Sequence, residues 1–308
     1  MRRFLSVFLL GASFLNGDLE THLKKCPNKS DADCSISNID FIYLINLDQR
    51  PEKLEWSLNQ LAPYGIYPYR FSAVNGWELP LEAINDVGLV FSIEMEGGFL
   101  GTSYHLGGNF EPSHEIIQNY GQTYFCHCLA RGPIGIALSH ISILQDAYDS
   151  GYETIWVMED DIQVVRDPRS LSLMIEKLDH QVGRDNWDVL FTDRDMLDGN
   201  GNYTTTYWAG RRPDFTFFSK QNDYMRKIMI SPDFYQIGAR SGAHSMIIRR
   251  SGIKKLLEFF KAHQIFFPYD MEYILPLGIH LFTVVQDIVT NTPKAPSDNG
   301  GPNYLNKR

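Results

Sequence analysis

The stretch that decides the fold is YETIWVMEDDIQVVRD, residues 152–167. Its apolar run at residues 154–158 combines β-branched side chains with a tryptophan, a composition typical of a buried parallel strand. Three acids, Glu159, Asp160 and Asp161, follow without an intervening turn residue. Because side chains alternate along a strand, an extended continuation places Glu159 and Asp161 on one side and Asp160 on the other.

Carboxylates at this position indicate a ligand site. Open α/β sheets bind their ligands outside the carboxyl ends of the strands. Hard cations such as Mg²⁺ and Mn²⁺ favour oxygen ligands, and phosphate oxygens and water complete the coordination shell. The triplet therefore predicts a divalent cation site, although a solvated acidic loop explains the three residues alone equally well.

The flanking sequence predicts an α/β fold. FIYLINL at residues 41–47 reads as a first buried strand, and it is followed by a helix at 52–61 and a strand at 67–74, which together form a βαβ unit. Further strands are expected at 187–192, 246–248 and 279–285, and further helices at 134–148, 171–178 and 251–260. Arg50 lies at the first strand-to-helix junction. Its positive charge could lie beside a phosphate group there, or it could simply pair with Asp48 or Glu52.

Other acids also follow predicted strands or helices. Asp193 and Asp195 end the strand WDVLFT, and Asp270 and Glu272 follow the late helix. Asp193 and Asp195 are candidates for acceptor contacts or for a catalytic base, and a loop of solvated charges is the competing interpretation.

The chain divides into four expected parts. Residues 1–17 have the basic, apolar and small-residue layout of a secretory signal peptide, and residues 18–38 read as a polar linker. Residues 39–290 form one catalytic domain with an irregular insertion at 77–128, and the Pro, Gly and Asn-rich residues 291–308 form a loose tail. The leader predicts export, to the periplasm or exterior of a bacterium or to the endoplasmic-reticulum lumen of a eukaryote. Membrane contact is then expected only through the acceptor or an uncleaved leader.

The net charge argues against one class of partner, and the cysteine spacing argues against a zinc site. The 308 residues carry a formal net charge of −9, which argues against a general nucleic-acid binder. The four cysteines fall into two local pairs, Cys26 with Cys34 and Cys126 with Cys128. The Cys-His-Cys segment at residues 126–128 lacks the second pair of a specific zinc site, so a structural role is the favoured interpretation.

Four blocks in order resemble glycosyltransferase family 25, which includes lipooligosaccharide and procollagen galactosyltransferases. They are YLINLDQRPEK from residue 43, GPIGIALSHISI from 132, VMEDDIQV from 157 and GAHSMIIRRSGIKKLL from 242, with PYD at 268–270 after them. The resemblance implies a GT-A type, Rossmann-like mixed sheet flanked by helices. It also implies a nucleotide-sugar donor, usually UDP-galactose, and a divalent metal, Mn²⁺ or Mg²⁺.

The resemblance also suggests roles for individual residues, at the positions that match. It makes Asp161 the metal ligand and Glu159 a contact to the metal or the donor ribose, with Asp160 flanking them on the donor side. The block at residues 46–53 would face the donor, through Asn46 and Arg50. Gln49 and Lys53 depart from the arginines common in the family, and His244 matches no shared ligand. Asp270 matches the acid after the late helix and is the suggested general base, with Asp193 as the second candidate.

Together these features predict metal-dependent, inverting transfer of a hexose, galactose first, from a UDP-sugar to a hydroxyl group. The acceptor would be a glycan, a lipooligosaccharide or a hydroxylysine-type glycoprotein. Two alternatives stay open. One is an exported carbohydrate-binding protein with the same fold and no turnover. The other is a glycoside hydrolase that uses two carboxylates and needs no nucleotide.

Overall fold

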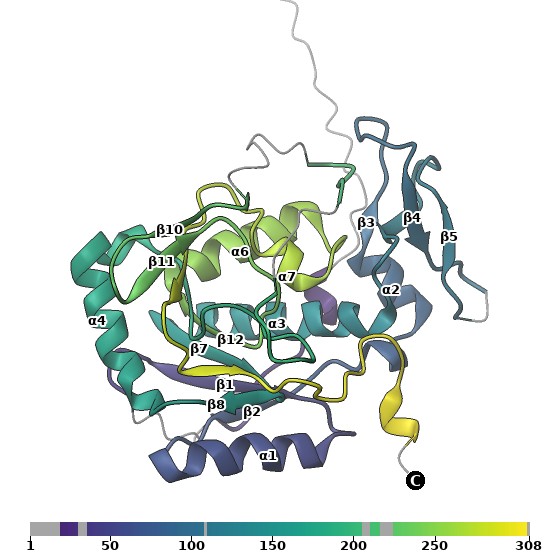
Figure 1. The fold of residues 1–308 in the computed structure, drawn as a ribbon. Helices are drawn as coiled ribbons and strands as arrows, with labels where there is room; N and C mark the ends of the chain where they lie inside the picture. Colours follow the sequence, from purple (N-terminus) through teal and green to yellow (C-terminus); the bar gives the residue numbers. More distant parts are fainter. Residues whose placement is uncertain (1–18, 30–35, 108–109, 205–209, 216–223, 307–308) are drawn as a thin grey trace, which may run out of the picture.

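The central sheet has eight strands in the order β10-β11-β13-β9-β12-β7-β1-β2 (Figure 1). Its strands are β1 Phe41–Asn46, β2 Tyr69–Ser72, β7 Thr154–Glu159, β9 Val189–Phe191, β10 Lys227–Met229, β11 Phe234–Ile237, β12 Ser245–Arg249 and β13 Leu281–Val284. β1 pairs in parallel with both β2 and β7, whereas β12 runs antiparallel between β7 and β9. The carboxyl ends of β1, β2 and β7 therefore lie at one edge of the sheet.

This computed structural model describes residues 19–29, 36–107, 110–204, 210–215 and 224–306. The predicted signal peptide at 1–17 lies outside these residues, as does Cys34, which forms a local pair with Cys26 in the sequence. No helix in the described part of the chain is long and apolar enough to cross a membrane.

Helices cover both faces of the central sheet (Figure 1). α1 Pro51–Leu61 and α4 Leu171–Val182 pack on one face, and α3 Arg131–Asp149, α6 Arg250–His263 and the short α7 Tyr269–Glu272 pack on the other. Both faces of β1 are buried, because Phe41, Tyr43 and Ile45 join the core around α3 and α6, while Ile42 and Leu44 join the core around α1 and α4. A mixed α/β sheet flanked by helices in a single domain, consistent with the GT-A type, is thereby confirmed.

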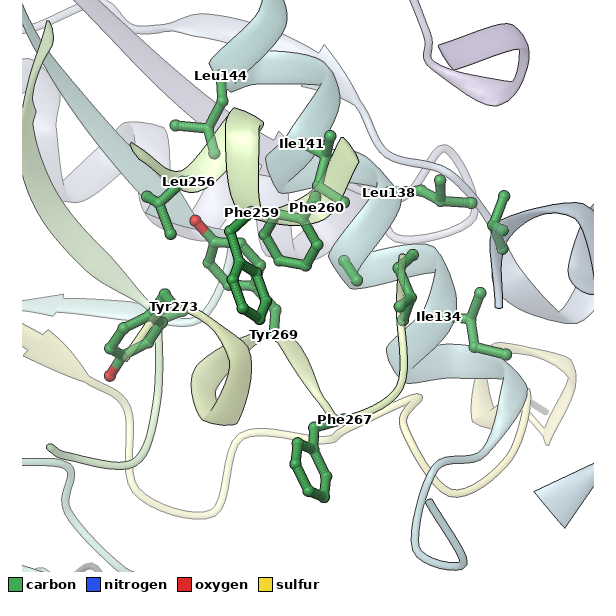
Figure 2. Close-up of a cluster of buried hydrophobic side chains, with 14 of the residues drawn as sticks. Ile134, Leu138, Ile141, Leu144, Leu256, Phe259, Phe260, Phe267, Tyr269 and Tyr273 are labelled. Atoms are coloured by element: carbon green, nitrogen blue, oxygen red, sulfur yellow. The ribbon is translucent and has the colours of Figure 1, made fainter. Parts of the chain in front are cut away.

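The larger core lies between α3 and α6 (Figure 2). The stripe of α3 predicted from the three-four spacing, Ile134, Leu138, Ile141 and Leu144, is buried there against Leu256, Phe259 and Phe260 of α6. Tyr269 and Tyr273 close this cluster beneath the sheet edge, so the short α7 is fixed by its aromatic side chains.

The segment expected to be irregular, residues 77–128, contains regular structure. It holds helix α2 Leu81–Val87 and a small antiparallel sheet in the order β3-β6-β4-β5. These strands are β3 Leu89–Val90, β4 Leu100–Ser103, β5 Ser113–Ile116 and β6 Thr123–Cys126. A strand of two to four residues is too short to show an alternating pattern in sequence. In β4, Gly101 lies so close to the Ile117 side chain that a larger residue would not fit. The prediction of an irregular insertion was therefore wrong for these elements.

The remaining short elements connect the main ones. A second small sheet pairs β8 Ile162–Val164 with β14 Val289–Asn291. The 3₁₀ turns are η1 Leu19–His22, η3 Ala62–Tyr64, η4 Gly76–Glu78, η5 Pro168–Ser170, η6 Arg184–Asn186 and η7 Asn303–Asn306.

The predicted polar linker and the tail that was expected to be loose both pack on the domain where they are described. In the predicted linker, the backbone N–H of Lys24 donates to Ser142 Oγ at 3.0 Å, and Lys29 forms an ion pair with Asp146 at 2.9 Å. In the tail, Asp298 is buried. Polar composition alone thus gave the wrong expectation, because these polar groups bind partners distant in sequence.

Candidate functional site

A cleft opens where β1, β2 and β7 end. Its lining comes from five segments: Ile45, Leu47, Arg50 and Lys53; residues 73–77; Gly132, Ile136 and Ser139; residues 159–161; and residues 297–299. It encloses about 700 Å³, counting the solvent at its mouth. The chain goes from β1 to β2 on one side and later adds β7 on the other, so the cleft lies at a topological switch point, where open α/β sheets bind ligands.

Glu159 ends β7 and faces this cleft. Its Oε1 accepts a hydrogen bond from Nε2 of His140 at 2.9 Å, and the His140 ring stacks on Tyr269 with centroids 4.1 Å apart. Burial alone would raise the pKa of Glu159, but the hydrogen bond from His140 and the charges of His140, His244 and Lys53 outweigh it and lower that pKa. Glu159 is therefore held as a carboxylate in a fixed orientation.

Asp161 is the least satisfied acid of the triplet. Its Oδ1 is buried without a hydrogen-bond partner among the described residues. Burial, and then the negative charge of Glu159, raise the pKa of Asp161 to about 6, against a smaller opposing effect of His244. Glu159 and Asp161 line the same cleft, and one of these carboxylates has an oxygen that receives no hydrogen bond, so together they could hold a cation.

Asp160 points to the α1 side and is bound there. Its Oδ2 accepts from Asn46 Nδ2 at 2.7 Å, and its Oδ1 lies 3.5 Å from Lys53 Nζ. Asn46 also donates to the backbone oxygen of Arg50 and accepts from Arg70. Asn46 does not line the cleft and its amide is engaged by protein groups, so the structure places it as an organiser of the β1 end rather than against a donor.

Arg50 lines the cleft, but its guanidinium is already paired. Asp298 of the tail accepts from Arg50 Nε at 2.6 Å and from Nη2 at 2.5 Å, while Glu52 lies 3.4 Å from Nη1. The backbone oxygen of Asp298 accepts from Trp77 Nε1 at 2.7 Å. The tail therefore forms one wall of the cleft, and the pairing with Glu52 expected as an alternative is present but secondary.

The Asp298→Ala variant is expected to lose about 3–5 kcal/mol of unfolding free energy, because it leaves the buried Arg50 without its counter-charge. The measurement is urea unfolding of the purified chain. Glu52→Gln is the matched control, since Glu52 pairs with the same guanidinium but is 47% exposed, and a loss of at most about 1 kcal/mol is expected. Equal losses in both variants would contradict a dominant role for the tail.

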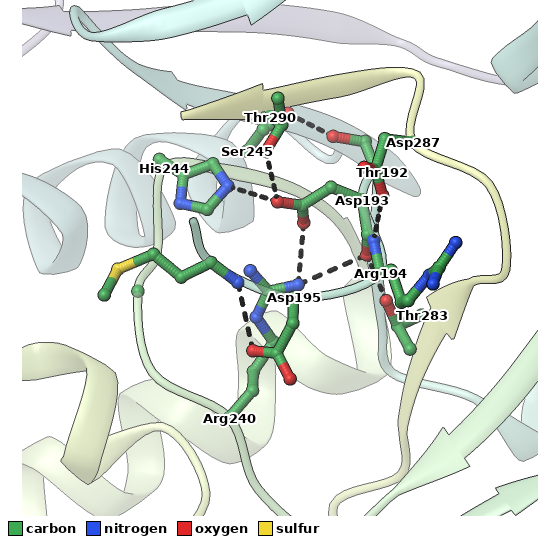
Figure 3. A network of polar contacts seen from close by, with 12 residues as sticks. Thr192, Asp193, Arg194, Asp195, Arg240, His244, Ser245, Thr283, Asp287 and Thr290 are labelled. Carbon is green, nitrogen blue, oxygen red and sulfur yellow. Dashed lines mark hydrogen bonds and ion pairs between the residues drawn. The ribbon is translucent and has the colours of Figure 1, made fainter. Parts of the chain in front are cut away.

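Asp193 lies at the end of β9 inside a buried polar network (Figure 3). Its Oδ1 accepts from Arg240 at 2.7 Å, and its Oδ2 accepts from His244 Nε2 at 2.8 Å and Thr290 Oγ1 at 2.9 Å. Burial opposes ionisation, but Arg240 and His244 hold the pKa of Asp193 far below its usual range. A fully buried carboxylate with three donors neither reaches an acceptor nor takes its proton, so the structure does not support Asp193 as the base.

Asp270 is a more suitable base. It lies in α7, partly exposed, and its Oδ2 accepts from the backbone N–H of Gly242 at 2.8 Å. Burial and the negative charge of Glu159 raise the pKa of Asp270, against the opposing effects of the Gly242 N–H and His140. The charges of Glu159 and His140 both act on this carboxylate, although it does not line the cleft itself.

A family model described as glycosyltransferase family 25 (LPS biosynthesis protein) matches residues 39–272. This range covers most of the chain and includes the acidic triplet, Asp193, His244 and Asp270. The chain belongs to glycosyltransferase family 25. Asp298 lies beyond the matched range, so the family match does not include the tail contact with Arg50.

Curated members of family 25 are distant relatives of this chain. A glycosyltransferase 25 family member of Aedes aegypti is 25% identical over 187 residues, which cover 61% of this chain and 25% of the relative. Procollagen galactosyltransferase 1 of Danio rerio is 24% identical over 194 residues, covering 60% and 28%. Inactive glycosyltransferase 25 family member 3 of Homo sapiens is 24% identical over 159 residues, covering 51% and 22%. The chain spans about a quarter of the length of these relatives.

Two histidines of this family 25 domain were not assigned to the site from sequence. Ser139, the neighbour of His140 in α3, donates to the Gly135 oxygen at 2.7 Å and accepts from the Val74 N–H at 2.8 Å, which are packing contacts. His140 instead fixes Glu159, and His244 links Asp193 to the acidic pair. The backbone oxygen of His244 also accepts from the Glu159 N–H at 2.9 Å. The position of His244 follows from the pairing of β12 with β7. Ser245 pairs with Met158, so His244, which precedes β12, lies next to Glu159, the last residue of β7.

Proposed function

We propose that this protein transfers a hexose from a UDP-sugar to an acceptor hydroxyl, with inversion and with the help of a divalent cation. The observation that carries the proposal is the paired carboxylate site of Glu159 and Asp161 in a cleft at the switch point of the sheet. Galactose is the first candidate sugar, because one relative is named a procollagen galactosyltransferase. The family description and that name support a lipooligosaccharide, glycan or hydroxylysine-type acceptor.

The residues at the site fit a divalent cation, Mn²⁺ or Mg²⁺. Within the described ranges, no group of three or more His, Cys, Asp or Glu side chains is arranged to hold a metal. Two carboxylates are nevertheless sufficient, since such cations are commonly bound by one or two carboxylates together with substrate phosphates and water. Asp161 and Glu159 would hold the ion, which when bound would neutralise the diphosphate leaving group.

The remaining groups of the chain support the same reaction. His140 fixes the Glu159 carboxylate, and Lys53 and Arg50 line the side of the cleft where a diphosphate would lie, each already paired with an acid of the protein, Asp160 and Asp298. Asp270 would take the proton of the incoming hydroxyl, and burial together with the charge of Glu159 raises its pKa above the ordinary aspartate value, which makes the carboxylate a stronger base. Export through the predicted leader is part of this proposal, with the acceptor as the main partner.

A carbohydrate-binding protein without turnover is the second candidate. It is favoured by the human relative, which is named inactive although it matches about half of this chain. Under this alternative the cleft would still bind nucleotide or sugar, and no product would form.

The test is titration calorimetry of UDP with and without Mn²⁺, followed by turnover of UDP-galactose and UDP-glucose. We expect UDP to bind in the presence of the metal and not after a chelator has removed it. We also expect the protein to release UDP from one of the two donors. Binding without UDP release would support the binding protein. Release of sugar from a glycan with no dependence on nucleotide would support the hydrolase instead.

A further inference from the structure

The proposed transfer reaction does not use the Cys-His-Cys segment at residues 126–128, whose two thiols lie close together. Cys126 is the last residue of β6, and the backbone N–H of Leu129 donates to its oxygen at 3.0 Å, closing a four-residue turn. The turn brings Sγ of Cys126 and Sγ of Cys128 to 2.9 Å. This separation is only about 0.9 Å longer than a disulfide bond.

We propose that Cys126 and Cys128 form a thiol–disulfide site, in which exposed Cys128 reacts with a low-molecular-weight disulfide and buried Cys126 resolves the product as an intramolecular disulfide. Nothing in the transfer chemistry requires this pair. The inference therefore stands apart from the proposed function, and either can fail without the other.

The two thiols have unequal environments, as an attacking and a resolving cysteine require. Cys126 is 4% exposed, whereas Cys128 is exposed to solvent. The hydrogen bond from Cys126 lowers the pKa of Cys128 to about 7, although partial burial and the charge of Asp270 oppose this effect. The same hydrogen bond, together with burial, raises the pKa of Cys126. Near neutral pH, Cys128 therefore carries the thiolate, which is the reactive form, and Cys126 keeps its proton.

A small disulfide has room to reach the pair. The turn borders a cavity of about 800 Å³, counting open solvent, which is also lined by Phe99, Leu100, Gly210, Arg211, Phe266 and Phe267. Arg211 is exposed on this rim, where it pairs with exposed Glu96 at 3.3 Å, and an arginine suits the carboxylates of a peptide disulfide such as oxidised glutathione. His127 lies between the two cysteines and also lines the cavity.

The exchange is balanced with oxidised glutathione as the oxidant. The Cys128 thiolate attacks one sulfur, the glutathione disulfide bond breaks, and one glutathione thiolate leaves. Cys126 then loses its proton, and its thiolate attacks the Cys128 sulfur and displaces the second glutathione thiolate. Two protein thiols are oxidised by two electrons, and one disulfide is reduced to two thiols that carry the two protons.

The site is connected to the segment that holds Asp270. The backbone N–H of Cys126 donates to the oxygen of Phe266 at 2.8 Å. The N–H groups of Phe266 and Phe267 in turn donate to Oε1 of buried Glu272, at 2.8 and 2.6 Å, and Asp270 lies between them in sequence. Formation of the disulfide would therefore change a turn that is hydrogen-bonded directly to residues 266–272, the segment that contains Asp270.

The experiment uses the purified full chain, reduced and then equilibrated in glutathione buffers from fully reduced to fully oxidised. Free thiols are trapped with N-ethylmaleimide, and trypsin peptides are analysed by mass spectrometry. Tryptic residues 71–131 contain Cys126 and Cys128 and no other cysteine, so Cys26 and Cys34 do not confuse the result. We expect this peptide to lose two hydrogens and all labelling in oxidising buffer, and to regain both labels after dithiothreitol.

Two variants separate the roles of the cysteines. In Cys126→Ser, Cys128 should stop as a mixed disulfide with one glutathione, and in Cys128→Ser, Cys126 should keep its free thiol under the same conditions. A wild-type chain in which both cysteines stay labelled in every buffer would overturn the proposal. A stable glutathione adduct on wild-type Cys128 would also overturn it. Because the decisive measurement is on the wild-type chain, a variant that fails to fold leaves the test intact.

Discussion

The Asp161→Asn variant is expected to lose at least about 100-fold in turnover of a UDP-sugar, because a cation at the leaving diphosphate contributes several kcal/mol to the barrier. Asparagine keeps the size of the side chain and removes the charge that the cation would need. The unpartnered Oδ1 and the raised pKa of Asp161 identify it as the acid that the protein itself leaves unsatisfied. Initial rates at saturating Mn²⁺ and UDP affinity by calorimetry are the measurements, with thermal unfolding to verify the fold.

Asp160→Asn is the matched control, since it removes the same charge from the adjacent residue. Asp160 is engaged by Asn46 and Lys53, and an asparagine there can still accept the hydrogen bond from Asn46. Its turnover should stay within about 10-fold of wild type, roughly the effect of losing one partly screened contact. Equal losses in both variants would mean that only the total charge of the triplet matters. Wild-type turnover by Asp161→Asn would contradict the role of Asp161 as a ligand of the cation.

The central sheet is predictable from sequence because its strands are apolar runs with clear ends. The run at residues 41–47 is observed as β1 Phe41–Asn46, and the run at 154–158 as β7 Thr154–Glu159. Both are buried on two faces, so a continuous apolar pattern is what their environment requires. The placement of the acids at the sheet edge follows from the same pattern.

Contacts between distant segments are not predictable in this way. Arg50 and Asp298 are 248 positions apart, and nothing in the composition of the tail marks Asp298 as buried. The function of His140 depends on the packing of α3 against β7 and α7, which places its ring on Tyr269 and its Nε2 on Glu159. Asp193 shows the opposite case, because its position at a strand end suggested a base, while tertiary contacts engage both of its oxygens.

The Asp270→Asn variant is expected to lower kcat by about 10²–10⁴-fold, the usual contribution of a positioned general base, while leaving UDP affinity unchanged. Asparagine can still accept the hydrogen bond from the Gly242 N–H, so α7 should keep its position. UDP affinity is expected to stay the same because Asp270 does not line the cleft. Single-turnover rates with a UDP-sugar and a hydroxyl acceptor, alongside UDP calorimetry, separate the two quantities.

The pH dependence provides the sharper test of Asp270. A base acts as the carboxylate, so the rate should fall as the pH drops through its pKa, and burial together with the charge of Glu159 raises that pKa. At saturating Mn²⁺, which would keep Asp161 ionised, the acidic limb of the wild-type profile should thus lie above the ordinary aspartate value of about 4, and Asp270→Asn should lack it. Asp195→Asn is the control, because Asp195 also follows a strand but lines a different cavity beside Lys227. If Asp195→Asn lost the acidic limb and Asp270→Asn kept it, Asp195 would be the base instead of Asp270. The acceptor would then have to bind on the side of the site where β9 ends.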